Sequence, residues 1–235
     1  MVQGGSTVTG PRIRSLSLLY LSFLLDSCLG AGHGPDFQGY GRCIGSDTYR
    51  LSPQQIEEIK TADIDRTQVL NDGTRSGYID GVGKQNDRFR EYVTKQNWEK
   101  YPELTNFIKE LQSEPIRKMI ADMVGNKNNF EGSYVRLEVL NDTQGFWLKP
   151  HCDIPEKLIS SLIYINDTAE DITLGTDLYN ERLELVDTVP FWHNFGYIFH
   201  GPNKWHGMEK GKTIRTERRG IQINYVTFET DWKVK

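Results

Sequence analysis

The spacing of hydrophobic residues changes near Phe130, and this change constrains the fold more than any other feature of the sequence. Before it, residues 102–125 carry apolar side chains at helical spacing, with one interruption at Pro115. After it, residues 133–140 alternate strictly, and later β-rich segments are separated by turns. Several short strands without helices between them indicate an antiparallel sandwich or jelly roll. We therefore expect a mainly β fold with supporting N-terminal helices, an α+β arrangement around a jelly-roll core.

The organisation of the chain follows from the same change. A length of 235 residues suits one domain with an appended segment. Ser52 is a plausible N-cap and Pro53 stands at the first helical position, so a helix is expected to begin there. We predict a single domain over residues 46–235, with helical support over residues 46–130 and the jelly-roll core over residues 131–230.

The N-terminal residues 1–45 are expected to lie outside the folded core. Two arginines precede an apolar run at residues 16–25, and small residues follow it, which is the layout of a secretory signal peptide. The run is shorter than the about 20 residues that span a bilayer, so no stable membrane insertion is expected. Asp26 follows directly, and no A-x-A-like cleavage site ends the run. The alternatives are a flexible extension in a cytoplasmic protein, which we favour, or secretion if residues 1–32 are a signal peptide.

Composition excludes some partners. The net charge is −4, so no basic field indicates nucleic-acid binding. The three cysteines, Cys28, Cys43 and Cys152, form no CxxC spacing, and their odd number argues against a disulfide framework. A reducing compartment is the simpler interpretation.

One short polar segment, KPHCDIPE, has the spacing of a metal site or of a polar turn. In an extended chain, residues i and i+2 point to the same side, so His151 and Asp153 converge while Cys152 points away. A third ligand is expected from another strand, and both His200 and His206 follow the apolar run GYIF. Two histidines and one carboxylate form the facial triad that suits non-haem Fe(II) and O₂ chemistry. His193 is expected to be a packed or hydrogen-bonded side chain rather than a ligand.

The motifs HCD, LIYIN, LGTDLYN, GYIFHGPNKWHGME and RRGIQINYV occur in the order found in a known family. This set, over roughly residues 133–228, resembles the Fe(II)- and 2-oxoglutarate-dependent dioxygenases, most closely the prolyl-hydroxylase-like branch. The resemblance implies a double-stranded β-helix, a cupin-like jelly roll. It also implies that the metal ligands and catalytic residues are His151, Asp153 and His206, with His206 matching the HG of the family motif in preference to His200.

The same resemblance implies a basic residue that binds the far carboxylate of 2-oxoglutarate. Aligning the last strand favours Arg218 over Arg219, and alternation places these two on opposite faces, so that only one can enter the barrel. A guanidinium suits this role because its planar fork matches a carboxylate. Tyr164 matches the family tyrosine that hydrogen-bonds the same carboxylate, and the alternative is a core tyrosine whose hydroxyl is satisfied elsewhere.

The implied function is a dioxygenase that uses Fe(II), O₂ and 2-oxoglutarate to hydroxylate an unactivated C–H bond, releasing succinate and CO₂. The alternatives are a cupin-like metal enzyme that does not use 2-oxoglutarate, and a non-catalytic jelly-roll binding module. The substrate is a small molecule or a peptidyl group, and the sequence leaves open proline, a free amino acid, a sugar or a lipid, as it does the oligomeric state. Arg75, Arg88 and Arg90 either meet an acidic group of the substrate or form a solvated surface.

Overall fold

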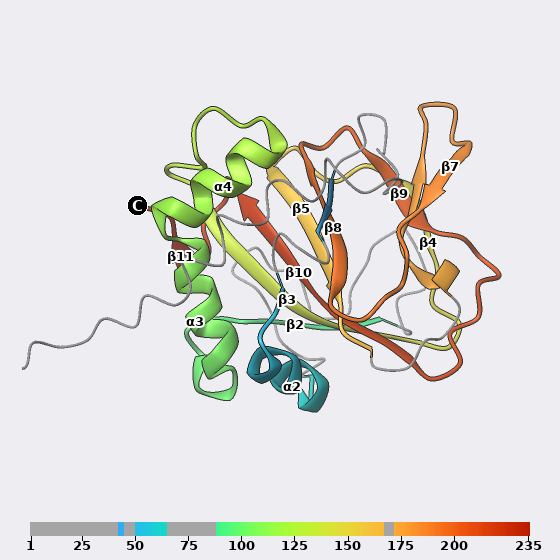
Figure 1. The fold of residues 1–235 in the computed structure, drawn as a ribbon, viewed down its shortest axis with the longest axis horizontal. Coiled ribbons are helices and arrows are strands. Elements are labelled where there is room, and N and C mark those ends of the chain that lie inside the picture. Colours follow the sequence, from blue (N-terminus) through green and yellow to red (C-terminus); the bar gives the residue numbers. More distant parts are fainter. Residues whose placement is uncertain (1–41, 45–49, 65–87, 167–171) are drawn as a thin grey trace, which may run out of the picture. The chain divides into compact units, whose positions relative to one another are not determined.

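The computed structural model describes residues 42–44, 50–64, 88–166 and 172–235, and these form two antiparallel sheets with helices beside them (Figure 1). Within the described residues, the larger sheet has seven strands in the order β1 (Arg42–Ile44), β8 (Phe195–His200), β5 (Lys157–Tyr164), β10 (Glu217–Val226), β3 (Tyr134–Thr143) and β11 (Trp232–Lys233), with β2 (Arg88–Tyr92) also paired to β3. The smaller sheet has the order β4 (Leu148–His151), β9 (Trp205–Met208), β6 (Asp177–Tyr179) and β7 (Leu185–Thr188).

The helices begin where the sequence predicts. Helix α2 (Pro53–Thr61) has Ser52 as its N-cap, and a complete capping box joins Ser52 to Gln55. Helices α3 (Pro102–Leu111) and α4 (Glu114–Val124) are separate because Pro115 lies in the first turn of α4, where its missing N–H costs no helical hydrogen bond. Two short 3₁₀ helices, η2 (Trp98–Lys100) and η3 (Ile172–Leu174), complete the described helical elements.

Strand β10 shows how the larger sheet divides its two faces. Ile221, Ile223 and Tyr225 pack into a core with Leu104, Phe107, Ile108 and other residues of the helices. Each such fully buried side chain contributes about 1.5–3 kcal/mol of hydrophobic stabilisation. Tyr225 also stacks on Phe130, and its hydroxyl donates to the carbonyl of Leu111 at the end of α3. The opposite face of β10 carries Arg218, Gly220, Gln222 and Asn224, and this face meets the smaller sheet.

Two facing antiparallel sheets with helices on one of them form the predicted jelly roll, and the expected mainly β fold class is confirmed. Strands β1 and β2 belong to the larger sheet, although they fall in segments that the sequence assigned to the extension and to the helical support. The rest of the predicted extension lies outside the described residues. No described helix is both long enough and apolar enough to cross a bilayer.

Candidate metal centre

The pairing of β4 with β9 brings two histidines together. His151 is the last residue of β4, and it lies directly opposite His206 of β9 in the antiparallel register. Opposite residues in such a pair have Cβ atoms about 4.5–5.5 Å apart. The two imidazole ring centroids accordingly lie 4.4 Å apart. The backbone ladder alone therefore sets the separation of the two candidate ligands.

Gly207 allows this close pairing. A Cβ atom at Gly207 would lie 2.6 Å from the carbonyl oxygen of Leu148 and 2.9 Å from that of Lys149. Both contacts are with backbone, which cannot move aside without separating β4 from β9. The glycine after His206 is therefore required by the approach of the two strands.

Each imidazole is held in one tautomer by a backbone carbonyl. Nδ1 of His151 lies 2.9 Å from the carbonyl oxygen of Lys149, and Nδ1 of His206 lies 2.8 Å from that of Lys204. Because a carbonyl only accepts, Nδ1 must donate, which leaves the Nε2 lone pair available to a metal. Burial and the neighbouring His206 lower the pKa of His151 to about 4, so this ring is neutral at pH 7, as a ligand must be.

The carboxylate of Asp153 completes the group. Its Oδ2 lies 3.9 Å from Nε2 of His206, and one donor atom from each of His151, Asp153 and His206 lies within 4.8 Å of the other two. Lys157 donates to Oδ1 at 2.6 Å, and the Ser160 hydroxyl donates to Oδ2. Burial alone would raise the pKa of Asp153, but Lys157 and His206 hold it below its usual range. The carboxylate is therefore charged and fixed in position.

This donor set fits Fe(II). Two imidazoles and one carboxylate on one side of a cavity make a facial triad with open positions opposite. A closed structural zinc site would need a fourth protein ligand, typically sulfur. In the part of the chain that the structure describes, this is the one cluster of His, Cys, Asp or Glu donors that could hold a metal ion, and it includes no cysteine.

The two other histidines considered from the sequence lie apart from this cluster. His200 ends β8 opposite Ile159 and is exposed. Nδ1 of His193 lies 3.0 Å from the carbonyl oxygen of Ile165, so this ring is hydrogen-bonded to the backbone. The structure thus brings together the three residues that the sequence selected and keeps the rival His200 on the surface.

A cavity of about 60 Å³ adjoins the three candidate ligands. The two sheets both contribute to its walls, together with residues of the connecting segments. Besides the three ligands, its lining comprises Arg90, Phe146, Leu148, Lys157, Leu162, Thr176, Tyr197, Gly207, Met208, Arg218 and Gln222.

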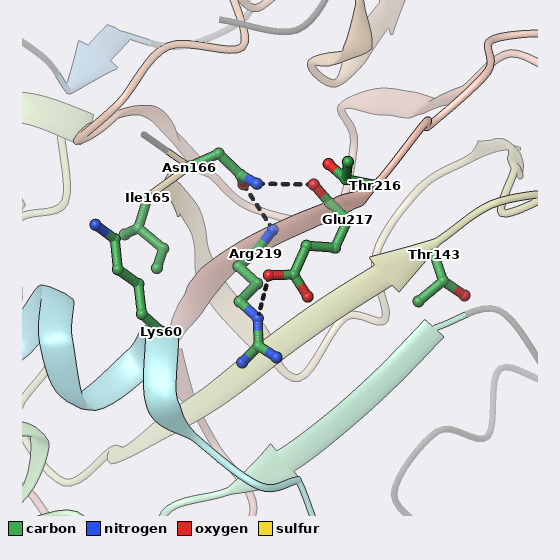
Figure 2. Close-up of a pocket in the computed structure, with 7 residues that line it drawn as sticks. All are labelled: Lys60, Thr143, Ile165, Asn166, Thr216, Glu217 and Arg219. Atoms are coloured by element: carbon green, nitrogen blue, oxygen red, sulfur yellow. Dashed lines mark hydrogen bonds and ion pairs between the residues drawn. The ribbon is translucent and has the colours of Figure 1, made fainter. Parts of the chain in front are cut away.

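Arg218 and Arg219 lie on opposite faces of β10. Arg218 is 3% exposed, lines the cavity and forms an ion pair with Asp142, its neighbour on β3. Its Nε is buried and has no hydrogen-bond partner among the described residues. Arg219 lines a different pocket, on the outer face, where it pairs with Glu217 at 2.9 Å (Figure 2). Its Nη1 also donates to the carbonyls of Ile59 and Ala62 at the end of α2.

Tyr164 has its hydroxyl engaged within the core. The backbone N–H of Thr176 donates to this oxygen at 2.8 Å, and the Thr176 hydroxyl lies 2.8 Å away. The Tyr164 ring packs under the Arg218 guanidinium, whose carbon lies 5.2 Å from the ring centroid. Of the two alternatives left open by the sequence, this geometry matches the hydroxyl satisfied elsewhere. Tyr164 therefore contacts the arginine directly and the cavity only indirectly.

Sequence reasoning missed several residues of the cavity wall. Tyr197 of β8 lines the cavity, and burial raises the pKa of its hydroxyl, which therefore remains a donor. Lys157, which also lines the cavity, forms an ion pair with Asp153, and Asp142, which does not line it, forms an ion pair with Arg218. Alternation along β8 and β3 was the available signal, because it places Tyr197 and Asp142 on the face that carries Arg218.

No family model matches the sequence, and no curated protein sequence matches it. Solved structures do match. A prolyl hydroxylase from Trichoplax adhaerens, solved with a peptide fragment of the hypoxia inducible factor oxygen degradation domain, is 14% identical with a TM-score of 0.53, over 80% of this chain and 84% of that chain. HygX from Streptomyces hygroscopicus, solved with nickel, 2-oxoglutarate and hygromycin B, is 12% identical with a TM-score of 0.53, over 83% and 87%.

A putative oxygenase from Shewanella oneidensis also matches, at 12% identity and a TM-score of 0.50, over 81% of this chain and 83% of that chain. Identities this low establish a shared fold. The chain therefore has the jelly-roll fold of the prolyl hydroxylases and related 2-oxoglutarate oxygenases, and the resemblance seen in its motifs is confirmed at the level of the fold.

Proposed function

We propose that this protein is an Fe(II)- and 2-oxoglutarate-dependent oxygenase, and that His151, Asp153 and His206 bind the metal. The observation that carries this proposal is the convergence of two imidazoles and a carboxylate in a cavity that a buried arginine also lines. The shared fold supports the same reaction class.

The protein's own residues prepare the metal site before any metal binds. The carbonyls of Lys149 and Lys204 orient the two rings so that each Nε2 is the ligand atom. Ser160, on the larger sheet, holds one oxygen of Asp153, and Lys157 holds the other. When bound, Fe(II) with O₂ and 2-oxoglutarate supplies the oxidising chemistry that hydroxylates a C–H bond and yields succinate and CO₂.

We propose that Arg218 binds the far carboxylate of 2-oxoglutarate. Its guanidinium is buried and charged, and its free Nε has no partner among the described residues. The apolar lining residues Phe146, Leu162 and Met208 suit the methylene carbons of the cosubstrate and exclude water. Tyr164 orients the guanidinium through its ring, and direct binding of the cosubstrate by Tyr164 stays a prediction.

The test is an anaerobic titration of 2-oxoglutarate into Fe(II)-loaded protein. Chelation of the metal by a 2-oxo acid produces a visible charge-transfer band, which we expect in the wild type. His206→Ala removes a ligand and should abolish the band. His200→Ala changes an exposed histidine of the preceding strand and serves as the matched control. A folded, iron-loaded wild type that gives no band would contradict the proposal, and so would a band that survives in His206→Ala.

One observation favours a second candidate. Arg218 already has a countercharge in Asp142, so it does not require the carboxylate of 2-oxoglutarate. This favours an enzyme that uses the same metal site without 2-oxoglutarate. Such a cupin-like enzyme would bind Fe(II) through the three ligands and give no 2-oxo acid band. The same titration therefore separates the two candidates.

The proposed substrate class is broad. The Trichoplax prolyl hydroxylase was solved with a peptide and HygX with hygromycin B, so ligands of both sizes are bound by proteins of this fold. A small-molecule or a peptidyl substrate is accordingly proposed, with C–H hydroxylation as the reaction.

A further inference from the structure

We propose that Arg90 binds an anionic group of the substrate, a carboxylate, phosphate or sulfate, in the same cavity as the metal site. This inference rests on the proposed function, because it identifies a substrate subsite of that oxygenase. Arg90 lines the cavity together with His151, Asp153 and His206, and no other basic side chain of β2 or β3 does so among the described residues.

The register separates Arg90 from the arginine proposed for the cosubstrate. Arg90 of β2 lies opposite Leu140 of β3, which in turn lies opposite Gly220 of β10. Two strand spacings therefore divide Arg90 from β10, or about 10 Å. Arg218 approaches the cavity from β10 and Arg90 from the far side of β3. The cavity is thus lined by two arginines that come from either side of β3.

The guanidinium of Arg90 has donors to spare. Its Nη1 donates to the Tyr92 hydroxyl at 3.0 Å and pairs with Glu138 at 3.2 Å. The buried Nε has no hydrogen-bond partner among the described residues. The side chain is only 12% exposed, so bulk water does not readily satisfy that donor. A buried donor without a partner is costly, and an anionic oxygen is its best acceptor.

The charges around the cavity also call for an anion. Among the described residues, three cationic side chains line it: Arg90, Lys157 and Arg218. Asp153 is the one carboxylate of that lining, while Glu138 and Asp142, which pair with Arg90 and Arg218, do not line the cavity. The wall that a substrate meets therefore carries more cationic than anionic groups, which favours an anionic group of the substrate.

Lys157 is a less suitable partner than Arg90 for an anionic group of the substrate. Its ammonium is committed to Asp153 at 2.6 Å, and that carboxylate is a proposed metal ligand. Lys157 adds to the positive field on the same wall, while Arg90 offers the free donor. The assignment to Arg90 therefore depends on its unpartnered Nε and on its place in the cavity.

The experiment measures anion binding by calorimetry, anaerobically, on protein saturated with Fe(II) and 2-oxoglutarate. The probes are acetate, inorganic phosphate and sulfate, with acetamide as the neutral counterpart of acetate. We expect at least one anion to bind with a roughly millimolar dissociation constant, and acetamide not to bind. Comparing the three anions identifies the oxyanion that the site prefers.

The variants test the residue. Arg90→Gln should weaken the preferred anion about tenfold or more, as expected for loss of a charge-assisted hydrogen bond. Arg90→Lys keeps the charge and should weaken it less. Arg136→Gln is the matched control, because Arg136 pairs with the same Glu138 at 2.7 Å without lining the cavity, and it should change the affinity less than about threefold.

The outcomes separate this inference from the proposed function. If the wild type gives no charge-transfer band, the proposed function itself is contradicted. A wild type that shows the band and binds none of the anions overturns the inference alone. An equal loss in Arg136→Gln would indicate a general field, and loss of the band in Arg90→Gln would assign Arg90 to the cosubstrate. Either result overturns the inference.

Discussion

Arg218 and Arg219 are neighbours in sequence with opposite environments, and this contrast gives a direct prediction. Arg218→Ala should weaken 2-oxoglutarate binding by about 3–5 kcal/mol, or roughly two to four decades, because it removes a buried charge partner. Arg219→Ala removes an ion pair with a partly exposed Glu217 and should change that affinity by less than about 1 kcal/mol. Titration of the charge-transfer band measures both. The reverse result would make Arg219 the pocket arginine.

The ion pair of Asp142 with Arg218 gives a second prediction at the scale of residues. Asp142→Asn leaves the buried Arg218 without its countercharge, which should lower the free energy of unfolding by about 3–5 kcal/mol. The far carboxylate of 2-oxoglutarate would replace the missing charge. Thermal unfolding should therefore show a larger increase in melting temperature with 2-oxoglutarate in Asp142→Asn than in the wild type. Equal increases would argue that the cosubstrate does not reach Arg218.

Strand alternation explains which residues the sequence could assign. The convergence of His151 with Asp153 and the opposite faces of Arg218 and Arg219 depend only on a period of two, and both occur in the structure. The hydroxyl partner of Tyr164 depends on where the segment with Thr176 packs, and the ion pair of Arg218 depends on the register of β3 against β10. Register is a long-range property, so local patterns did not reveal these contacts.

At the scale of elements, the β4–β9 pair is the unit that holds the two histidines, and Gly207 is its point of closest contact. Gly207→Ala should push the strands apart and lower metal affinity by more than about tenfold. Losses of this size are typical when a residue that positions a metal ligand is changed. Metal titration of the purified protein measures this.

Gly132→Ala provides the control for that variant. Gly132 has φ +74° and open space around its Cα, so alanine there costs stability through backbone strain alone. Both variants should be less stable than the wild type, and only Gly207→Ala should lose metal affinity. If the two variants bind metal equally, the strand approach does not set the ligand geometry.

Some helices and strands could be predicted from the sequence and others could not. The capping box of α2 and the helix break at Pro115 are local signals, and the structure has both. Strand β2 was missed because it follows a polar, charge-rich stretch and its partner, β3, begins some forty residues later in the chain. Strand β1 was missed for a similar reason, since pairing with β8 joins opposite ends of the chain.

At the scale of the whole molecule, the candidate ligands draw on both sheets. His151 and His206 belong to the smaller sheet, while Asp153 is hydrogen-bonded to Ser160 of the larger one. A metal ion bound by all three would therefore fasten the sheets together. Bound at one hundred times its dissociation constant, it should add about 2.7 kcal/mol to the free energy of unfolding.

Thermal unfolding with and without added metal measures this stabilisation. We expect a clear increase in melting temperature for the wild type and for His200→Ala. His206→Ala should show little increase, because it keeps only two of the three ligands. A full increase in His206→Ala would mean that the ion binds elsewhere on the protein.

The neighbouring arginines of β10 bear on how such a site can change over time. Arg219 looks like a spare for Arg218, one position away, but it cannot act as one. To bring Arg219 inward, the strand would have to slip by one residue, which would also turn Ile221, Ile223 and Tyr225 out of the helix-covered core. A lineage that lost the inner arginine could therefore regain it only by reversion at the same codon or from a different strand. The doubled arginine gives the chain no redundancy.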